Sequence, residues 1–268
     1  MKKRKFLRIE ELNWKEIKDL DKEKTLVVIP ISPLEAHGPH LPVGTDILVT
    51  EEICKEMIAR LKKKRRGLSI VLYPTLTIGY CGVNDDLPGS VSVDAKAFEK
   101  IIHDTLKALA NHGFRYIMIL TFHADPFYVK AIHNAIKKVR NAKHVEIAEP
   151  LSKIFYRNRE EEFLHSGREE TSIMLYLYPY LVDKTYKSLK EVRLAHSLRN
   201  LRKTLREIGA VDGYTGDPSN ANMELGKRLF DQMVDSCVEV ALKLLDGKYE
   251  ECLPAPLRYL PLSLRRRI

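Results

Sequence analysis

Residues 33–46 read PLEAHGPHLPVGTD and directly follow an apolar run, TLVVIPI, at residues 25–31. The apolar run predicts a buried strand, and the segment after it places carboxylates and imidazoles among prolines and glycines. The three prolines restrict the backbone and lower the entropy cost of ordering this loop, whereas the two glycines permit turns that other residues resist. The chain therefore leaves a core strand and at once presents polar side chains on a stiff loop.

Strand-like and helix-like segments alternate along the chain, although residues 149–222 are less regular. Such alternation predicts βαβ units, and hence an α/β fold with a mostly parallel central sheet flanked by helices. We expect one domain over residues 1–268, with its motif-bearing core at about 25–245. The expected strands are 25–32, 68–73, 115–122 and 144–148, and the expected helices are 46–61 (capped by Thr45 or Asp46), 94–112, 126–140 and 223–245.

Composition narrows the class of protein. A chain of 268 residues with 44% hydrophobic content can bury a sizeable core. No stretch approaches the length of a transmembrane helix, and no apolar signal core follows the basic N-terminus, so we expect no membrane partner. The four cysteines are scattered, with neither CxxC spacing nor the density of a disulfide scaffold, which favours a reducing, cytoplasmic setting.

The formal net charge of +9 sits largely in three runs, at residues 2–5, 62–66 and 265–267. Such runs are usually solvated faces or tails. They also lack the interleaved aromatic residues of a surface that binds single strands. We therefore expect no nucleic-acid partner, although binding through these runs would reveal itself as a steep salt dependence.

Two predicted strands end in groups that can bind metal. Glu35 and His37 lie just past the first strand, and His123 and Asp125 lie just past the third. In open α/β sheets, ligands sit outside the carboxyl ends of the strands, so these loops are expected to meet. Imidazole nitrogens and carboxylate oxygens suit zinc, manganese or iron, and Asp46 has two oxygens with which to bridge two ions. The alternative is that these are hydrogen-bonding turn residues and that Asp46 is only a helix cap.

Four segments together resemble the creatininase family of metal-dependent amidohydrolases. The first is similar at every fixed position to the family pattern E-x-H-G-x-H-L-P-x-G-T-D. The others resemble the family's F-P-G-T, H-A-G-x-x-E-T-S and G-D-P…A-x-x-E-x-G segments. In chain order they are residues 35–46, 87–94 (LPGSVSVD), 164–175 (LHSGREETSIML) and 213–229 (GYTGDPSNANMELGKRL).

The resemblance implies a binuclear metal centre in an α/β layered fold, usually in a homo-oligomer and possibly a hexamer. By that likeness, Glu35 and His123 bind one ion, His37 binds the other, and Asp46 bridges the two. Two divalent ions (Zn, Mn or Fe) are the implied cofactors.

The likeness leaves the remaining carboxylate of the second site open. Creatinine-cleaving members carry an acidic residue two positions after the second-loop histidine, where this chain has Asp125. Members with an N-G-H-G-G-N loop have glycine there, and for them the glutamate of E-T-S, here Glu170, is the better candidate. His165 would lie near the reacting carbonyl as a proton donor or acceptor, the alternative being a structural hydrogen bond that holds its loop.

The implied function is hydrolysis of a C–N bond in a cyclic amide or formamide, a small-molecule substrate, by a water activated between the two ions. The chain departs from the pattern in its second loop, T-F-H-A-D-P, so the alternative is a catalytically inactive, metal-binding oligomeric scaffold. Asn84 and Arg168 are candidate substrate-binding residues. Creatinine itself is disfavoured, because creatinine-cleaving members surround the ring with tryptophans and the single tryptophan here, Trp14, is far from every motif in sequence.

Overall fold

The computed structural model describes residues 6–157, 164–194, 200 and 202–264. Its centre is a five-stranded sheet in which every neighbouring pair of strands is parallel, with the order β1-β3-β2-β4-β5. The expected α/β class is confirmed, and the short edge strand β1 is an addition to the four predicted strands. The strands are β1 (Leu7–Arg8), β2 (Thr25–Pro30), β3 (Ser69–Leu72), β4 (Tyr116–Leu120) and β5 (Glu146–Ala148).

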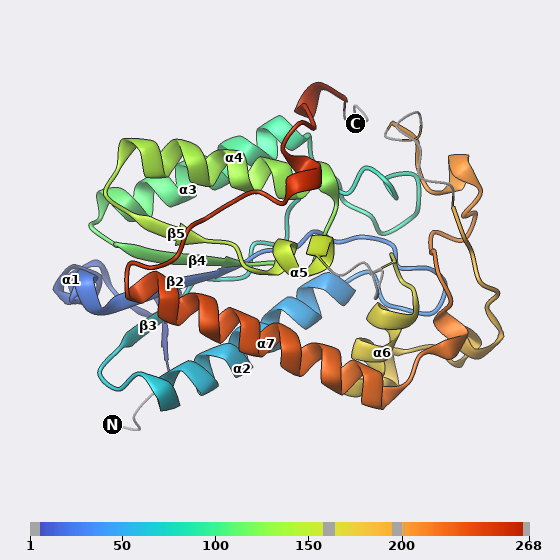
Figure 1. Ribbon diagram of the computed structural model, residues 1–268, viewed down its shortest axis with the longest axis horizontal. Helices are drawn as coiled ribbons and strands as arrows, with labels where there is room; N and C mark the ends of the chain where they lie inside the picture. The colour runs from blue at the N-terminus through green and yellow to red at the C-terminus, as the bar shows by residue number, and fades with distance from the viewer. Residues whose placement is uncertain (1–5, 158–163, 195–199, 201, 265–268) are drawn as a thin grey trace.

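Helices cover both faces of the sheet (Figure 1). Successive residues of β2 point to opposite faces, so Leu26 and Val28 pack in the layer of α2 and α7, whereas Val27 and Ile29 pack in the layer of α3 and α4. A strand buried on both faces explains why its sequence is a continuous apolar run. The helices are α1 (Trp14–Asp19), α2 (Thr45–Lys64), α3 (Ala95–Asn111), α4 (Pro126–Ala142), α5 (Leu151–Arg157), α6 (Arg168–Leu177) and α7 (Met223–Leu245).

The start of α2 corrects one expectation. The N-cap is Gly44, which has no side chain with which to cap the helix, and the helix begins at Thr45. The Thr45 hydroxyl instead donates to the carbonyl of Pro42 at 2.7 Å. Asp46 therefore lies inside the first turn, and its carboxylate is directed at histidines rather than at the helix backbone.

Helices α5 and α6 lie in the region where the sequence predicted nothing regular. A close approach to α7 fixes α6: a Cβ built on Gly226 would lie 1.9 Å from the carbonyl oxygen of Ser172. Only glycine allows this separation of the two helices. The long helix α7, which spans the sheet in Figure 1, thereby holds the helix that carries Glu170.

Of the three basic runs, only residues 62–66 fall within the described structure, and those at 2–5 and 265–267 lie outside it. Lys63, Lys64 and Arg66 are exposed at the end of α2, as a solvated face would be. Among the described helices, none combines the length and the apolar character needed to cross a bilayer.

Candidate metal centre

Polar side chains converge beyond the carboxyl ends of β2 and β4, which are neighbours in the sheet. Glu35 and His37 follow β2, His123 and Asp125 follow β4, and Asp46 enters from the first turn of α2. All five are at most 6% exposed. The edge of the sheet predicted from the sequence therefore holds these residues in one buried site.

The first group consists of Glu35, Asp46 and His123, whose ligand atoms lie within 4.8 Å of one another. Nδ1 of His123 is 3.0 Å from Oε2 of Glu35 and 3.0 Å from Oδ2 of Asp46. The other ring nitrogen, Nε2, lies 3.0 Å from the carbonyl oxygen of Tyr80 and donates to it. This carbonyl fixes the tautomer, so the lone pair of Nδ1 points at two carboxylate oxygens.

The second group is built in the same way around His37. Its Nδ1 lies 2.8 Å from the backbone carbonyl of Glu35, to which it donates. Its Nε2 then faces Oδ1 of Asp46 at 3.2 Å and Oε2 of Glu170 at 3.7 Å. The two oxygens of Asp46 thus face two different histidines, which is the geometry required of a bridging carboxylate.

Charge and burial shift the pKa values strongly at these residues. Burial would lower the pKa of His37, but the neighbouring Asp46, Glu170 and Glu35 raise it to about 10. Burial likewise disfavours the charged form of Asp46, yet His37 and His123 hold its pKa far below the ordinary value. For Glu170, burial and the nearby carboxylates outweigh His37 and raise the pKa to about 7. The negative charge that these carboxylates concentrate around His37 and His123 favours a cation at this site.

The donor set fits two divalent ions. Each histidine has one nitrogen committed to a backbone carbonyl and the other aimed at two carboxylate oxygens. This is the usual orientation of histidines that bind metal, because the outer hydrogen bond holds the ring and frees the inner lone pair. Mixed imidazole and carboxylate groups suit zinc, manganese or iron alike.

The two candidates for the remaining carboxylate occupy different places. Asp125 is the N-cap of α4, and its Oδ1 accepts from the backbone N–H groups of Phe127 at 2.8 Å and Tyr128 at 3.1 Å. Its Oδ2 has no hydrogen-bond partner among the described residues, and burial raises its pKa to about 6. Glu170, on α6, is the one of the two that approaches His37.

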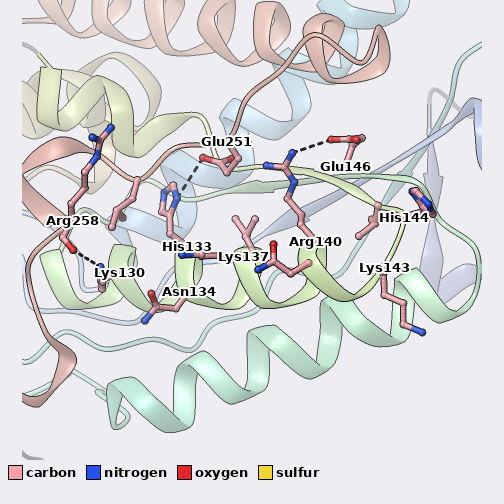
Figure 2. Close-up of a pocket in the computed structure, with 14 residues that line it drawn as sticks. Lys130, His133, Asn134, Lys137, Arg140, Lys143, His144, Glu146, Glu251 and Arg258 are labelled. Carbon is pink, nitrogen blue, oxygen red and sulfur yellow. Dashed lines mark hydrogen bonds and ion pairs between the residues drawn. The ribbon is translucent and has the colours of Figure 1, made fainter.

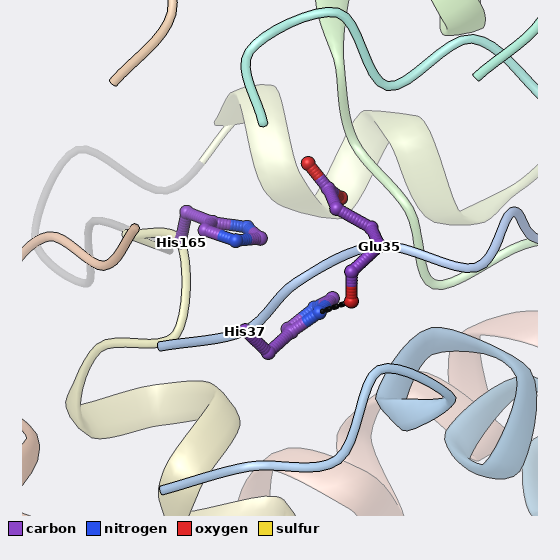
Figure 3. A group of neighbouring side chains, drawn as sticks. All are labelled: Glu35, His37 and His165. Atoms are coloured by element: carbon purple, nitrogen blue, oxygen red, sulfur yellow. Dashed lines mark hydrogen bonds between the residues drawn. The ribbon is translucent and has the colours of Figure 1, made fainter. Parts of the chain in front are cut away.

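His165 and Asn84 lie beside the first loop. Figure 3 shows the ring of His165 reaching across from the chain before α6 toward Glu35 and His37. Its centroid is 4.4 Å from that of His37, and its Nε2 lies 2.9 Å from the Ala36 carbonyl. The Asn84 amide nitrogen is 2.8 Å from the same Nε2 and 3.3 Å from Oε1 of Glu35. Asn84 therefore connects the first metal group to His165.

Arg168, a candidate substrate-binding residue, forms an ion pair with its neighbour on α6. Its guanidinium contacts Oε1 of the adjacent Glu169 at 2.8 Å and 2.9 Å, and its side chain is 42% exposed. His40, a fixed position of the family pattern, contacts the hydroxyl of Thr171 at 2.8 Å. Burial, together with His37, lowers the pKa of His40 to about 4, so this imidazole is neutral and joins the first loop to α6.

Sequence reasoning missed two backbone groups that orient the site. One is the Tyr80 carbonyl that holds His123. The other is the N–H of Ser166, which donates to Oε2 of Glu170 at 2.7 Å. Ser166 adopts a positive φ of 55°, the one non-glycine residue in the described chain to do so. Strained backbone of this kind is common at functional sites. The orientation of a backbone carbonyl or N–H cannot be predicted from the identity of its residue.

A family model described as "Creatinine amidohydrolase" (Creatininase) matches residues 10–241 of the chain. Creatinine amidohydrolase of Pseudomonas putida is 28% identical over 197 residues, 65% of this chain and 72% of that protein. The mycofactocin precursor peptide peptidase of Mycobacterium ulcerans is 27% identical over 217 residues, 79% and 82% of the two chains. The 3-dehydro-scyllo-inosose hydrolase of Thermotoga maritima is 25% identical over 184 residues, 65% and 57% of the two chains.

Solved structures of creatininases share the fold. The structure called "Creatininase Mn" superposes with a TM-score of 0.68 at 22% identity, and the alignment covers 91% of this chain and 100% of the other. A mutant creatininase of Zn-Zn type gives 0.68 at 21% identity, covering 91% and 99%. These likenesses confirm the layered α/β architecture, and the family model confirms the resemblance seen in the four segments. The chain therefore belongs to the creatininase family.

Proposed function

We propose that this chain, a creatininase-family metal-dependent hydrolase, cleaves a C–N bond in a cyclic amide or formamide small molecule. The observation that carries the proposal is the pair of histidines whose free nitrogens face shared carboxylates. His123 and His37 are held by backbone carbonyls and aimed at the two oxygens of Asp46. The site thus has two neighbouring groups of metal ligands, and it is buried at the carboxyl edge of a parallel sheet. Such a site is suited to metal-assisted hydrolysis.

In this proposal Glu35, His123 and Asp46 would hold one ion, and His37, Glu170 and Asp46 would hold the other. Two such ions, when bound, polarise a carbonyl group and lower the pKa of water. Asp46 would be shared by the two sites, because its two oxygens face different histidines. Ser166 holds Glu170 in place through its N–H, since one carboxylate oxygen accepts that bond.

His165 is proposed to move the proton. Burial lowers its pKa, and His37 adds to the effect while Glu35 opposes it. The imidazole is therefore neutral near pH 7 and is able to accept a proton from the attacking water and pass it to the leaving amine. Asn84 positions this ring through the contact of its amide with Nε2.

The family includes enzymes that differ in the bond they cleave. Relatives include proteins named amidohydrolase, peptide peptidase and inosose hydrolase, so the family alone does not choose among these substrates. Turnover should be measured with Mn- and Zn-loaded protein on cyclic ureas, lactams, formamidopyrimidines and short peptides. We expect release of an amine from a cyclic amide or formamide, and no release from the His165→Ala variant.

Failure on every substrate by protein with two bound ions would favour the inactive scaffold instead. Cleavage of peptides alone would retain the hydrolase and reject the small-molecule substrate.

A further inference from the structure

A polar cavity lies along α4, and none of the metal-centre residues line it. It is a groove of about 760 Å³, bounded on one side by α4 and β5 and on the other by the chain after α7 (Figure 2). Its lining includes five cationic side chains and only two carboxylates. The cations are Lys130, Lys137, Arg140, Lys143 and Arg258, and the carboxylates are Glu146 and Glu251.

Both carboxylates of the groove already have partners. Glu146 is paired with Arg140 at 3.3 Å. Oε2 of Glu251 accepts from the backbone N–H of Glu149 at 2.7 Å, and its Oε1 lies 3.4 Å from Nδ1 of His133. These contacts leave the remaining cations of the groove without an acidic counterpart.

Three cations are unmatched. Within the described structure, the side chains of Lys137, Lys143 and Arg258 form no hydrogen bond or ion pair, and all three residues are exposed. Lys137 lies on α4 and Lys143 is the C-cap residue that follows it, so the two charges lie apart along the groove. A ligand that meets both of them needs more than one anionic group.

From these contacts we propose that the groove binds a condensed phosphate chain, as in a nucleoside triphosphate or inorganic tripolyphosphate. Ammonium and guanidinium groups are the common partners of phosphate oxygens in proteins. The volume of the groove falls in the range of small-molecule sites. The neighbouring Asn141 adds an amide donor on the same side of the groove, whereas the amide nitrogen of Asn134 already donates to Oε2 of Glu99 at 3.0 Å.

The shape of the groove disfavours a nucleic-acid strand. Its lining contains no Phe, Tyr or Trp on which bases could stack. At one end the Lys130 ammonium donates to the carbonyls of Leu257 at 3.2 Å and Arg258 at 3.0 Å, so it ties α4 to the facing segment. A nucleic-acid strand that ran along the groove would have to pass this contact between α4 and the facing segment.

Part of the groove lies outside the region that the family model matches. The family model matches residues 10–241, whereas Glu251, Leu253 and Arg258 form one wall of the groove. Three of the fourteen lining residues are thus supplied by chain outside the matched region.

The test is calorimetric titration of the metal-loaded protein with tripolyphosphate, ATP, adenosine and orthophosphate. We expect saturable binding of tripolyphosphate or ATP at one site per chain, with adenosine and orthophosphate binding at least tenfold more weakly. Equal affinities for the first two would identify the phosphate chain itself as the ligand, and a preference for ATP would identify a nucleotide.

Substitutions locate the site. Lys137→Ala and Arg258→Ala should each weaken binding about tenfold, and both should keep the fold because the two side chains are exposed. Lys107→Ala is the matched control: it removes the same charge from an exposed position on α3 and should leave affinity unchanged. Absence of saturable binding, or binding unaltered in both groove variants, would overturn the proposal. So would binding of a single-stranded RNA oligonucleotide without binding of tripolyphosphate.

Discussion

Replacing Glu170 with Gln should remove one of two bound metal ions. The change keeps the shape of the side chain and an oxygen that accepts from the Ser166 N–H, but it removes the negative charge. Oε2 of Glu170 lies 3.7 Å from Nε2 of His37. For a carboxylate within about 4 Å of a bound cation, each unit charge pair is worth about 4 kcal/mol at an effective dielectric constant near 20. The affinity of the second site should therefore fall about a thousandfold.

Asp125→Asn is the matched control for this prediction. It also neutralises a buried carboxylate, and the new amide oxygen can still accept from the backbone N–H groups of Phe127 and Tyr128. We expect this variant to keep both ions and the cap of α4. Asp46→Ala should lose most of both ions, because the oxygens of Asp46 face His37 and His123 separately.

Metal per folded subunit, counted by plasma emission after gel filtration, separates these outcomes. The expected contents are close to one ion for Glu170→Gln, two for Asp125→Asn and nearly none for Asp46→Ala. Two ions in Glu170→Gln with one in Asp125→Asn would reverse the assignment of the second site. Two ions in Asp46→Ala would show that the bridging role is wrong.

Three further outcomes are expected. Gly226→Ala should lower the free energy of unfolding by about 2 kcal/mol or more in urea titrations, because the added Cβ meets the Ser172 carbonyl. Gly44→Ala is the control: its added Cβ faces open space, so it should lower the free energy of unfolding by well under about 1 kcal/mol. Burial raises the pKa of Glu251 to about 7, so its contribution to stability is present below pH 4.5 and is lost as the pH rises through 7. Wild-type protein should therefore lose up to about 3 kcal/mol between pH 4.5 and 8 relative to Glu251→Gln, as measured by denaturant titration at each pH. Metal binding should release protons at pH 7, since the apo pKa of His37 is about 10, and calorimetry in buffers of different ionisation enthalpy should detect this release.

The fold was largely predictable because its sheet is buried on both faces. The apolar runs that became β2, β3 and β4 have no polar face to confuse the pattern, and amphipathic helices follow each of them. Helix α6 was not predicted, because its first two turns (REETSI) are rich in polar residues that are buried in the site instead of exposed. The helix is held from outside, by the close approach of α7 at Gly226. Tertiary contact, and not local pattern, decided this element.

In the candidate site, too, some features follow from the local sequence and others do not. Strand ends brought Glu35, His37 and His123 together as expected, because the carboxyl edge of a parallel sheet collects the loops that follow its strands. Local sequence had also allowed Asp46 to be a simple helix cap. The structure gives the start of α2 to Gly44, which has no side chain to compete for the backbone. The carboxylate is thereby free to face both histidines.

The orientation of those histidines explains why a buried site with so many charges can persist. Three carboxylates, Glu35, Asp46 and Glu170, surround the free nitrogens of two imidazoles. Once Glu170 is ionised, the site carries an excess of negative charge even when both rings are protonated. Burial makes that excess costly, and two divalent ions would reverse it. The backbone carbonyls of Glu35 and Tyr80 hold the rings in the tautomers that leave these nitrogens free. The loops after β2 and β3 are thus shaped for ions before any ion arrives, and their rigidity lowers the entropy cost of binding.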